Sequence, residues 1–240
     1  MSELLRLDKR VVALTGCSRG QAQNYIEGGW VLVDGVVVEQ PQFMVGTQQV
    51  TLHAEARPDE PEPATILLHA MADFDPRSGS PDAMDWFSAA NHAADDDSGV
   101  RPLKRHAFHQ SCPLPLEAGA SGLLVFTQDG RIARRLREDG SKLEQEYVVE
   151  VSGTIAADGL ERINRGISMH GRALPRVKAS WQNEVRLRIA ALDARPGQIR
   201  HLCTEVGLGV VSMRRRRIAR IAMGKLLPGQ WRYLPGYAKF

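Results

Sequence analysis

The sequence predicts an α+β protein made of a small N-terminal module and a larger C-terminal domain. Segments with apolar residues at helical spacing are interspersed with segments in which apolar and polar residues alternate, as in helices mixed with strands. A stretch rich in Pro and Glu, without periodicity, covers residues 54–64 and has the composition of a stiff linker. We therefore expect a module over residues 1–53, a linker over 54–64 and a domain over 65–240.

Charge is distributed unevenly along the chain, although the formal net charge is only +3. Residues 1–53 hold 4 Lys/Arg and 5 Asp/Glu (net −1), residues 54–100 hold 2 and 11 (net −9), and residues 101–240 hold 25 and 12 (net +13). A basic C-terminal part favours a polyanionic partner, although a solvated Arg-rich surface has the same composition.

The cysteines and the apolar segments indicate the compartment. Cys17, Cys112 and Cys203 are far apart and lack metal-ligand spacing, which argues for a reducing environment and against a metal site. The N-terminus lacks a signal-peptide pattern, and no apolar run approaches the roughly 18 residues that span a bilayer. We expect a cytoplasmic monomer without membrane contact.

Local signals define the elements of the N-terminal module. Apolar positions in Arg6–Leu14 have helical spacing, and Gly16 is placed to end that helix. Ser18 is a predicted cap for a second helix over Arg19–Glu27. Asp34-Gly35 between two apolar runs predicts a β-hairpin, and a strand over residues 49–52 closes the module.

The motifs of this module resemble a known RNA-binding module. Arg6-Leu7-Asp8-Lys9, Gly16-Cys17-Ser18-Arg19 and Gly29-Trp30-Val31-x-Val33-Asp34-Gly35 are similar to the αL-type module named after ribosomal protein S4. Such modules bind phosphates through Lys, Arg and helix N-termini. The resemblance implies that the RNA contacts are Arg6, Lys9, Arg10, Ser18, Arg19, Gln21 and Asn24. The alternative is a small domain whose cations are merely solvated.

The C-terminal domain is predicted to mix strands and helices throughout. The predicted elements are strand Thr65–Leu68, a short helix after Ser80-Pro81, a mobile surface loop over Asn91–Gly99, strand Gly122–Thr127, helix Arg131–Arg137, strand Glu144–Val151, helix Asp158–Ile167, strands Leu174–Ala179 and Glu184–Leu192, helix Ala194–Gly207 and strand Val210–Ile218.

The loop before Gly122–Thr127 resembles the catalytic loop of RNA pseudouridine synthases of the ribosomal RNA branch. In that family the loop reads Gly-Arg-Leu-Asp, and the following strand reads Gly-Leu-Leu-x-x-Thr before an Asn/Asp-Gly turn. Here the strand and turn match, but the loop reads Leu114-Pro115-Leu116-Glu117. By this resemblance the catalytic Asp falls on Glu117 and the loop Arg falls on Pro115.

Two further motifs carry the other expected catalytic residues. Glu144–Val151 is similar to the family's Glu-Lys-x-Tyr-x-Val-x-Val strand, so Tyr147 is expected against the target base while Gln145 replaces the Lys. A buried structural tyrosine is the alternative. Gln198-Ile199-Arg200 matches a Gln-Ile-Arg helix, which makes Arg200 the expected partner of the catalytic carboxylate, or else an Arg on a solvated helix face. The preceding Asn-Arg pair of the family is Pro196-Gly197 here.

The last strand motif completes the resemblance and implies the architecture. Arg215 and Arg217 occupy the family's apolar-x-Arg-x-Arg-Ile positions and, in a strand, share one face. We expect both to contact RNA. The resemblance implies a mixed, mainly antiparallel β-sheet flanked by helices.

Family members isomerise uridine without a cofactor or metal: the uracil is detached from the ribose, turned and rejoined through carbon. A carboxylate acts at the sugar, a basic residue orients it and an aromatic ring holds the base. Glu117 is longer than Asp by one C–C bond, ~1.5 Å, and a misplacement of about 1 Å can cost on the order of a hundredfold in rate. His69-Ala70-Met71 also departs from the family's Asn-Lys-Pro, and His69 there is expected to be an ordinary strand-end histidine.

Two functions therefore follow from the sequence. The first is an isomerase that acts on structured, ribosomal RNA through Glu117, with slow turnover or changed specificity. The second is a catalytically inactive relative that only binds such RNA.

Overall fold

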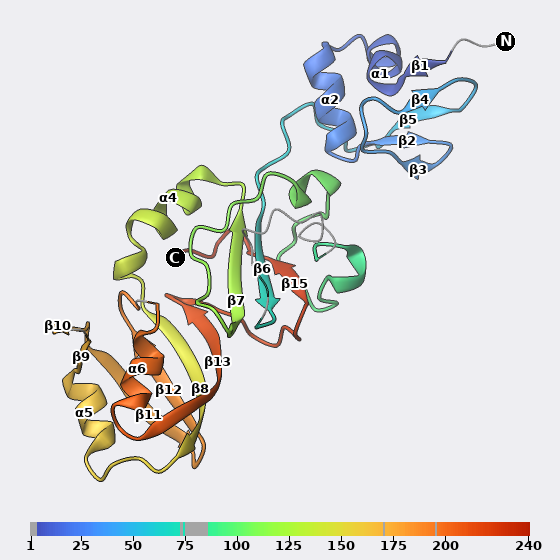
Figure 1. The fold of residues 1–240 in the computed structure, drawn as a ribbon. Helices are drawn as coiled ribbons and strands as arrows, with labels where there is room; N and C mark the ends of the chain where they lie inside the picture. The colour runs from blue at the N-terminus through green and yellow to red at the C-terminus, as the bar shows by residue number, and fades with distance from the viewer. Residues whose placement is uncertain (1–3, 73, 75–85, 170, 195) are drawn as a thin grey trace. The chain divides into compact units, whose positions relative to one another are not determined.

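The structure, a computed structural model, describes residues 4–72, 74, 86–169, 171–194 and 196–240. The chain forms two compact units, which are described separately (Figure 1). The N-terminal unit contains residues 1–63 together with residues 101–109, and the C-terminal unit contains residues 64–100 and 110–240. None of the described helices is long and apolar enough to cross a membrane.

The N-terminal unit follows the local signals of its sequence. Its elements are β1 (Leu5–Arg6), α1 (Leu7–Thr15), α2 (Arg19–Glu27), β2 (Val31–Val33), β3 (Val36–Val37), β4 (Met44–Val45) and β5 (Val50–Leu52). Gly16 ends α1 in the left-handed conformation with φ 71°, and Ser18 and Gln21 form a capping box at the start of α2. Asp34 and Gly35, both with positive φ, form the tight turn between β2 and β3, so the hairpin prediction is confirmed.

A second segment completes the N-terminal unit. Residues 101–109 contain the short 3₁₀ helix Lys104–Ala107. The Arg101 guanidinium lies 4.5 Å from the ring centroid of Trp30, and the main-chain N–H of Lys104 donates to Glu39 at 2.6 Å. The core of the unit is apolar and is formed by Leu7, Val11, Ala22, Ile26, Val31, Val33, Val38, Val45 and Val50.

One large sheet organises the C-terminal unit. Its strands are β6 (Thr65–Ala70), β7 (Ala120–Thr127), β8 (Gln145–Gly153), β11 (Val177–Asn183), β12 (Arg186–Ala191), β13 (Leu208–Ile218), β14 (Ile221–Ala222) and β15 (Trp231–Tyr233). The strand order is β11-β12-β8-β13-β7-β6-β15, with β14 paired to β13. The pairing of β13 with β7 is parallel and the other pairings of this sheet are antiparallel, which confirms the predicted mixed, mainly antiparallel sheet.

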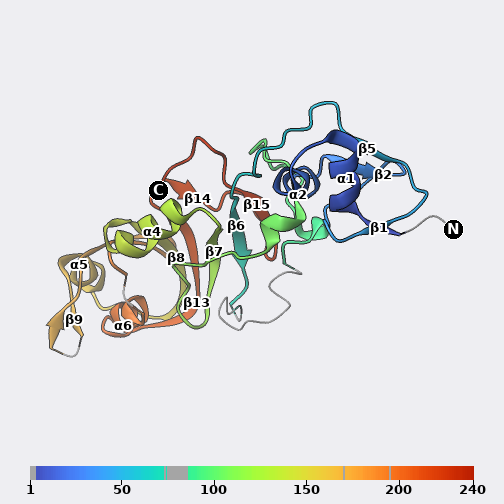
Figure 2. The same cartoon turned by 90° about the horizontal axis from the view of Figure 1, so that it is seen from above.

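Helices lie along this sheet, next to β7, β11 and β13. They are α4 (Gly130–Glu138), α5 (Gly159–Arg165) and α6 (Gln198–Thr204), and a small hairpin is formed by β9 (Ser168–Met169) and β10 (Arg172–Ala173). The Asp129 side chain caps α4 by accepting from the N–H of Arg131 at 2.8 Å. Helix α5 packs against β11 (Figure 1), and α6 packs against β13 (Figure 2).

The acidic tract Asn91–Gly99, which was predicted to be a mobile surface loop, is joined to β15 by two of its residues. The His92 ring stacks on Trp231 at a centroid distance of 4.1 Å, and its Nε2 lies 2.7 Å from the Asp96 carboxylate. Asp96 also accepts from the N–H of Tyr233 at 2.9 Å, so the tract is fixed to β15. The short helix expected after Ser80-Pro81 lies in residues 75–85, outside the described part of the chain.

Candidate active site

A buried arginine on β13 holds the loop that precedes β7, which carries Leu114, Pro115 and Glu117. The Arg215 side chain on β13 is 1% exposed. Its Nη2 donates to the carbonyl of Leu114 at 2.8 Å, its Nη1 to the carbonyl of Pro115 at 3.3 Å, and its Nε to the carbonyl of Leu123 at 2.9 Å. These bonds tie both the loop and the start of β7 to one side chain.

Glu117 stands at the end of this loop and is half-buried. Its Oε2 accepts a hydrogen bond from the main-chain N–H of Gly197 at 2.9 Å. Its carbonyl accepts from the N–H of Ala120 at 3.0 Å, which closes the turn into β7 through Gly119 at φ 75°. The hydrogen bond from Gly197 therefore fixes the orientation of the Glu117 carboxylate relative to the start of α6.

Tyr147 lies close to both Glu117 and Arg215. Its side chain is 6% exposed, and its hydroxyl donates to Oε1 of Gln145 at 2.9 Å. Burial raises the pKa of the Tyr147 phenol; the positive charge of Arg215 opposes this rise, while the negative charge of Glu117 adds to it. The charges of Glu117, on the loop, and of Arg215, on β13, therefore both act on the Tyr147 phenol.

Arg200 lies beside the same loop without pairing with its carboxylate. The side chain is exposed on α6, and a Cβ atom on Gly119 would lie 3.5 Å from its Nη2. Among the described residues, no Lys or Arg nitrogen lies within 4.0 Å of the Glu117 carboxylate. The structure thus brings Glu117, Tyr147 and Arg200 to one region, and the expected pairing of Arg200 with the carboxylate stays a prediction.

His69 is a structural histidine within β6. It is 3% exposed, and its Nδ1 lies 2.8 Å from the carbonyl of Leu226. Burial lowers its pKa, and the charges of Arg214 and Arg216 lower it further, while the hydrogen bond to Leu226 opposes them. The part of the chain that is described contains no cluster of His, Cys, Asp or Glu arranged to hold a metal ion.

Arg215 and Arg217 do not share a face, contrary to the prediction. The register of β13 against β8 shifts between these two residues, so Arg215 pairs with Tyr147 while Arg217 pairs with Glu146. A bulge of this kind adds one residue and turns the following side chains over. Arg215 is buried and therefore unavailable to RNA. Arg217 is half-buried and forms ion pairs with Glu144 at 2.5 Å and Glu146 at 3.1 Å.

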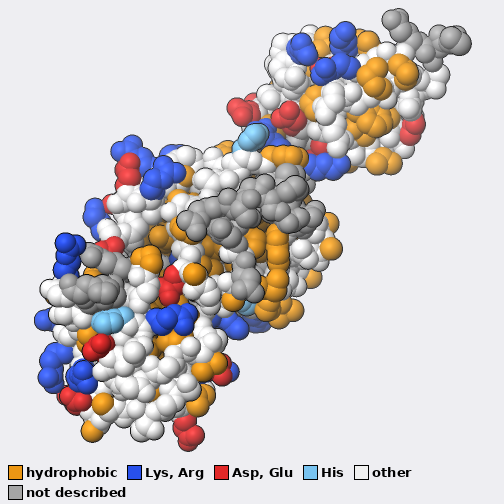
Figure 3. Space-filling model, in the orientation of Figure 1, with side chains coloured by type: hydrophobic (Ala, Val, Ile, Leu, Met, Phe, Trp, Pro, Cys, Tyr) orange, Lys and Arg blue, Asp and Glu red, His pale blue; other side chains and the backbone are white. Residues whose placement is uncertain are grey.

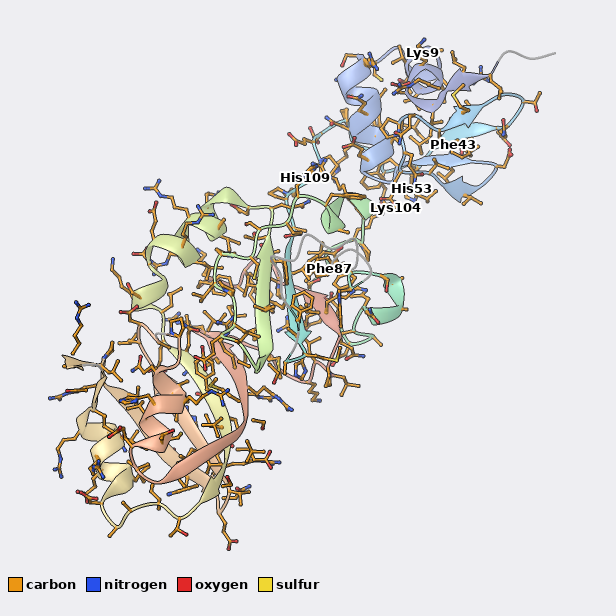
Figure 4. All side chains as sticks on the ribbon, viewed as in Figure 1. Lys9, Phe43, His53, Phe87, Lys104 and His109 are labelled. Atoms are coloured by element: carbon orange, nitrogen blue, oxygen red, sulfur yellow. The ribbon has the colours of Figure 1, made fainter. Side chains whose placement is uncertain are left out.

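Three of the predicted RNA contacts in the N-terminal unit are exposed cations. Lys9 and Arg10 are exposed on α1, and the Arg19 side chain is 69% exposed at the start of α2, although its Nε lies 3.5 Å from the buried Asp8 carboxylate. Lys and Arg side chains gather over these two helices in Figure 3, and Figure 4 labels Lys9 at the outer side of α1.

The other predicted RNA contacts form side-chain hydrogen bonds within the protein. Arg6 donates twice to the buried Asp8, at 3.2 and 3.1 Å. Ser18 and Gln21 bond to each other in the capping box, at 2.9 and 3.2 Å. Asn24 Nδ2 donates to the carbonyl of Pro58 at 3.0 Å, which fixes part of the predicted linker to α2.

Comparison with known proteins agrees with the N-terminal unit and with the C-terminal unit. Residues 5–50 match the S4 domain family. The ribosomal small subunit pseudouridine synthase A of Vibrio cholerae is 26% identical over 246 residues, covering 96% of each chain, and that of Escherichia coli K12 is 26% identical over 236 residues with the same coverage. An uncharacterized RNA pseudouridine synthase of Aquifex aeolicus is 24% identical, covering 96% of this chain and 92% of its own.

A solved structure gives the same result for the fold. The crystal structure of a pseudouridylate synthase aligns over 96% of each chain with a TM-score of 0.59 at 19% identity. Over nearly its whole length the chain is thus similar to RNA pseudouridine synthases. Its N-terminal unit is the S4 domain, and its large sheet carries the pseudouridine synthase fold.

Two features of the site were missed by sequence reasoning. Gln145, which stands where the resemblance places the family's Lys, accepts hydrogen bonds from both Tyr147 and Arg215. The main-chain N–H of Gly197 holds the Glu117 carboxylate. The substitution at Gln145 was visible in the sequence, but its partners are 2 and 70 residues away, and the more distant one could only be found from the fold.

Proposed function

We propose that this pseudouridine synthase relative isomerises a uridine in structured RNA with Glu117 as the catalytic carboxylate, and that its substrate is small-subunit ribosomal RNA. The proposal is carried by one observation. Glu117 ends a loop that Arg215 anchors at 2.8 and 3.3 Å, and its charge acts on the Tyr147 phenol. The names of the relatives from Vibrio cholerae and Escherichia coli supply the substrate class.

The residues of the chain divide the work as follows. The target uridine leaves its stack to reach the loop. The Glu117 carboxylate, oriented by the Gly197 N–H, acts at the ribose while the uracil is detached, turned and rejoined through carbon. Tyr147 is 6% exposed, so only a small part of this residue is available to contact the base. The exposed Arg200 beside Gly119 binds a phosphate next to the target or orients the carboxylate.

The S4 domain supplies affinity for the folded RNA. Lys9, Arg10 and Arg19 are the exposed cations among its predicted contacts. Contacts of this kind fix the position and orientation of the RNA without reading its sequence. We therefore assign the choice of uridine to the C-terminal unit and the docking of the RNA to both units.

A second candidate function is RNA binding without turnover. It is favoured by the surroundings of Glu117: the described residues place no cation within 4.0 Å of its carboxylate, and one oxygen is already engaged by Gly197. In this reading the added methylene of Glu, compared with Asp, has ended catalysis while the scaffold still binds RNA.

The test is an assay of the purified full-length protein on transcribed small-subunit ribosomal RNA. Pseudouridine is measured by mass spectrometry for the wild type, Glu117→Gln and the control Glu184→Gln, which changes an exposed carboxylate on the turn before β12. We expect one new pseudouridine with the wild type and the control, and a loss of about a hundredfold or more in Glu117→Gln. If the wild type binds this RNA and yields no pseudouridine, the second function is correct.

A further inference from the structure

A buried guanidinium without a nearby carboxylate needs an explanation. Arg215 makes its four hydrogen bonds to neutral oxygens, three main-chain carbonyls and Oε1 of Gln145 at 2.9 Å. Among the described residues it has no ion pair, and an arginine side chain does not lose its charge on burial. Burial of an unpaired charge is costly unless its hydrogen bonds are satisfied, so these acceptors must be held in place.

Two of the acceptors belong to the loop that carries Glu117. The carbonyls of Leu114 and Pro115 precede Glu117 by three and two residues, and both point at Arg215. Pro115 has lost the side-chain cation that the family has at this position, but its carbonyl still ties the loop to a cation. The position of the carboxylate is thus set through the main chain, from β13.

Gln145 joins this anchor to the tyrosine. It is 4% exposed, and its Oε1 accepts from Nη1 of Arg215 and from the hydroxyl of Tyr147, both at 2.9 Å. An amide oxygen has two lone pairs, so both are used. A lysine at this position could donate to the tyrosine hydroxyl, but it could not accept from Arg215 and would place a second positive charge beside it. Glutamine therefore suits this arrangement, in which one oxygen fixes both the ring and the arginine.

We infer that Arg215 and Gln145 are positioning residues, which hold the Glu117 loop and the Tyr147 ring in a fixed relation to each other. The inference rests on the proposed function for its catalytic consequence, but the anchoring itself does not depend on turnover. Loosening the anchor moves the carboxylate relative to the ring, and a shift of about 1 Å can cost on the order of a hundredfold in rate. Binding of the RNA, which depends on exposed cations elsewhere, is unaffected.

The experiment compares Gln145→Leu and Arg215→Lys with the controls Gln182→Leu and Arg186→Met, which are exposed residues on β11 and β12. For the full-length protein on small-subunit ribosomal RNA, we expect both test variants to lower kcat about tenfold or more, with KM within about twofold of wild type. The controls are expected to match the wild type. Arg215→Met is measured as a further variant, and Arg215→Lys, which keeps the charge with fewer donors, is expected to retain more kcat than it.

A second measurement separates this inference from the proposed function. Hydrogen exchange of peptides from residues 113–119 is expected to accelerate about tenfold in Gln145→Leu and Arg215→Lys, while peptides from residues 177–191 stay unchanged. If exchange at 113–119 is unchanged, or if it rises equally in both regions, the inference is wrong. If the wild type makes no pseudouridine but exchange responds as expected, the proposed function fails and the anchoring stands.

Discussion

A Cβ atom on Gly122 would lie 2.3 Å from the main-chain oxygen of Arg215 and 2.7 Å from its main-chain nitrogen. The two residues are paired where β7 and β13 run parallel, and Gly122 has φ +107°, a conformation that side chains rarely adopt. The close approach of these two strands brings the start of β7, and with it the Glu117 loop, next to Arg215. Any side chain at residue 122 would push the strands apart.

Gly122→Ala is therefore expected to be strongly destabilising. The clash with main-chain atoms cannot be relieved by a rotamer change, so we expect a loss of about 3 kcal/mol or more in the free energy of unfolding. Gly171→Ala is the matched control, because Gly171 has φ +74° with no atom within 4 Å of its added Cβ. It should lose only about 1–2 kcal/mol, the cost of the left-handed conformation. Urea unfolding of both variants checks this, and equal losses would show that the strand contact has no effect.

Elements specified by neighbouring residues were predictable from the sequence. The two helices of the S4 domain end or begin where Gly16 and Ser18 predicted, and the Asp34-Gly35 turn joins β2 to β3. These signals depend on the backbone preferences of one or two residues and on hydrogen bonds over three or four. These local preferences agree with the tertiary packing, so the elements form where the sequence predicts them.

Features that depend on distant residues were not predictable. Arg101–His109 belongs to the N-terminal unit because Arg101 lies over Trp30 and Arg105 pairs with Glu27 at 3.6 Å, contacts that cross about 70 residues of sequence. The bulge in β13 separates Arg215 from Arg217, although the four consecutive arginines read as a regular strand. In the site, family motifs indicated Glu117, Tyr147 and Arg200. That Arg215 is buried and bonded to the Glu117 loop could be seen only in the folded structure.

Acid is expected to destabilise the N-terminal unit through His106. Burial, together with the charge of Arg105, lowers the pKa of His106 to about 4. A hydrogen bond with the main chain of Glu62 opposes this decrease. The folded state thus keeps this histidine neutral, whereas the unfolded chain binds a proton near pH 6.5. Stability from His106 is complete above about pH 6.5 and is lost progressively as the pH falls towards 4.

This dependence is measured by urea unfolding at several pH values between 7.5 and 4.5. Hydrogen exchange of α2 reports the unfolding of the N-terminal unit. The midpoint of the wild type should fall as the pH decreases through this range, whereas His106→Gln should fall less steeply because it has no group to titrate. His53→Gln is the control, an exposed histidine of the same unit. The same slope in wild type and His106→Gln would mean that another group causes the acid sensitivity.

RNA binding by the S4 domain is expected to depend on Lys9 and Arg10 more than on Arg6. Lys9 and Arg10 are exposed on α1, whereas Arg6 donates to the buried Asp8 at 3.1 and 3.2 Å. A cation that already has a carboxylate partner gives less to a phosphate, because its charge is largely compensated. Each lost phosphate contact lowers the slope of log Kd against log salt by about 0.7–0.9.

Lys9→Ala combined with Arg10→Ala should therefore reduce the slope by about 1.4–1.8, whereas Arg6→Gln should change it by less than about 0.5. Binding of small-subunit ribosomal RNA to the full-length protein is titrated between low and moderate salt, with Arg57→Ala as a control for the loss of an exposed cation in the same unit. Thermal unfolding of Arg6→Gln checks the second half of the argument, since loss of one of the two arginine partners of the buried Asp8 lowers stability. A slope change in Arg6→Gln as large as that of the double variant would place Arg6 on the RNA despite its bonds to Asp8.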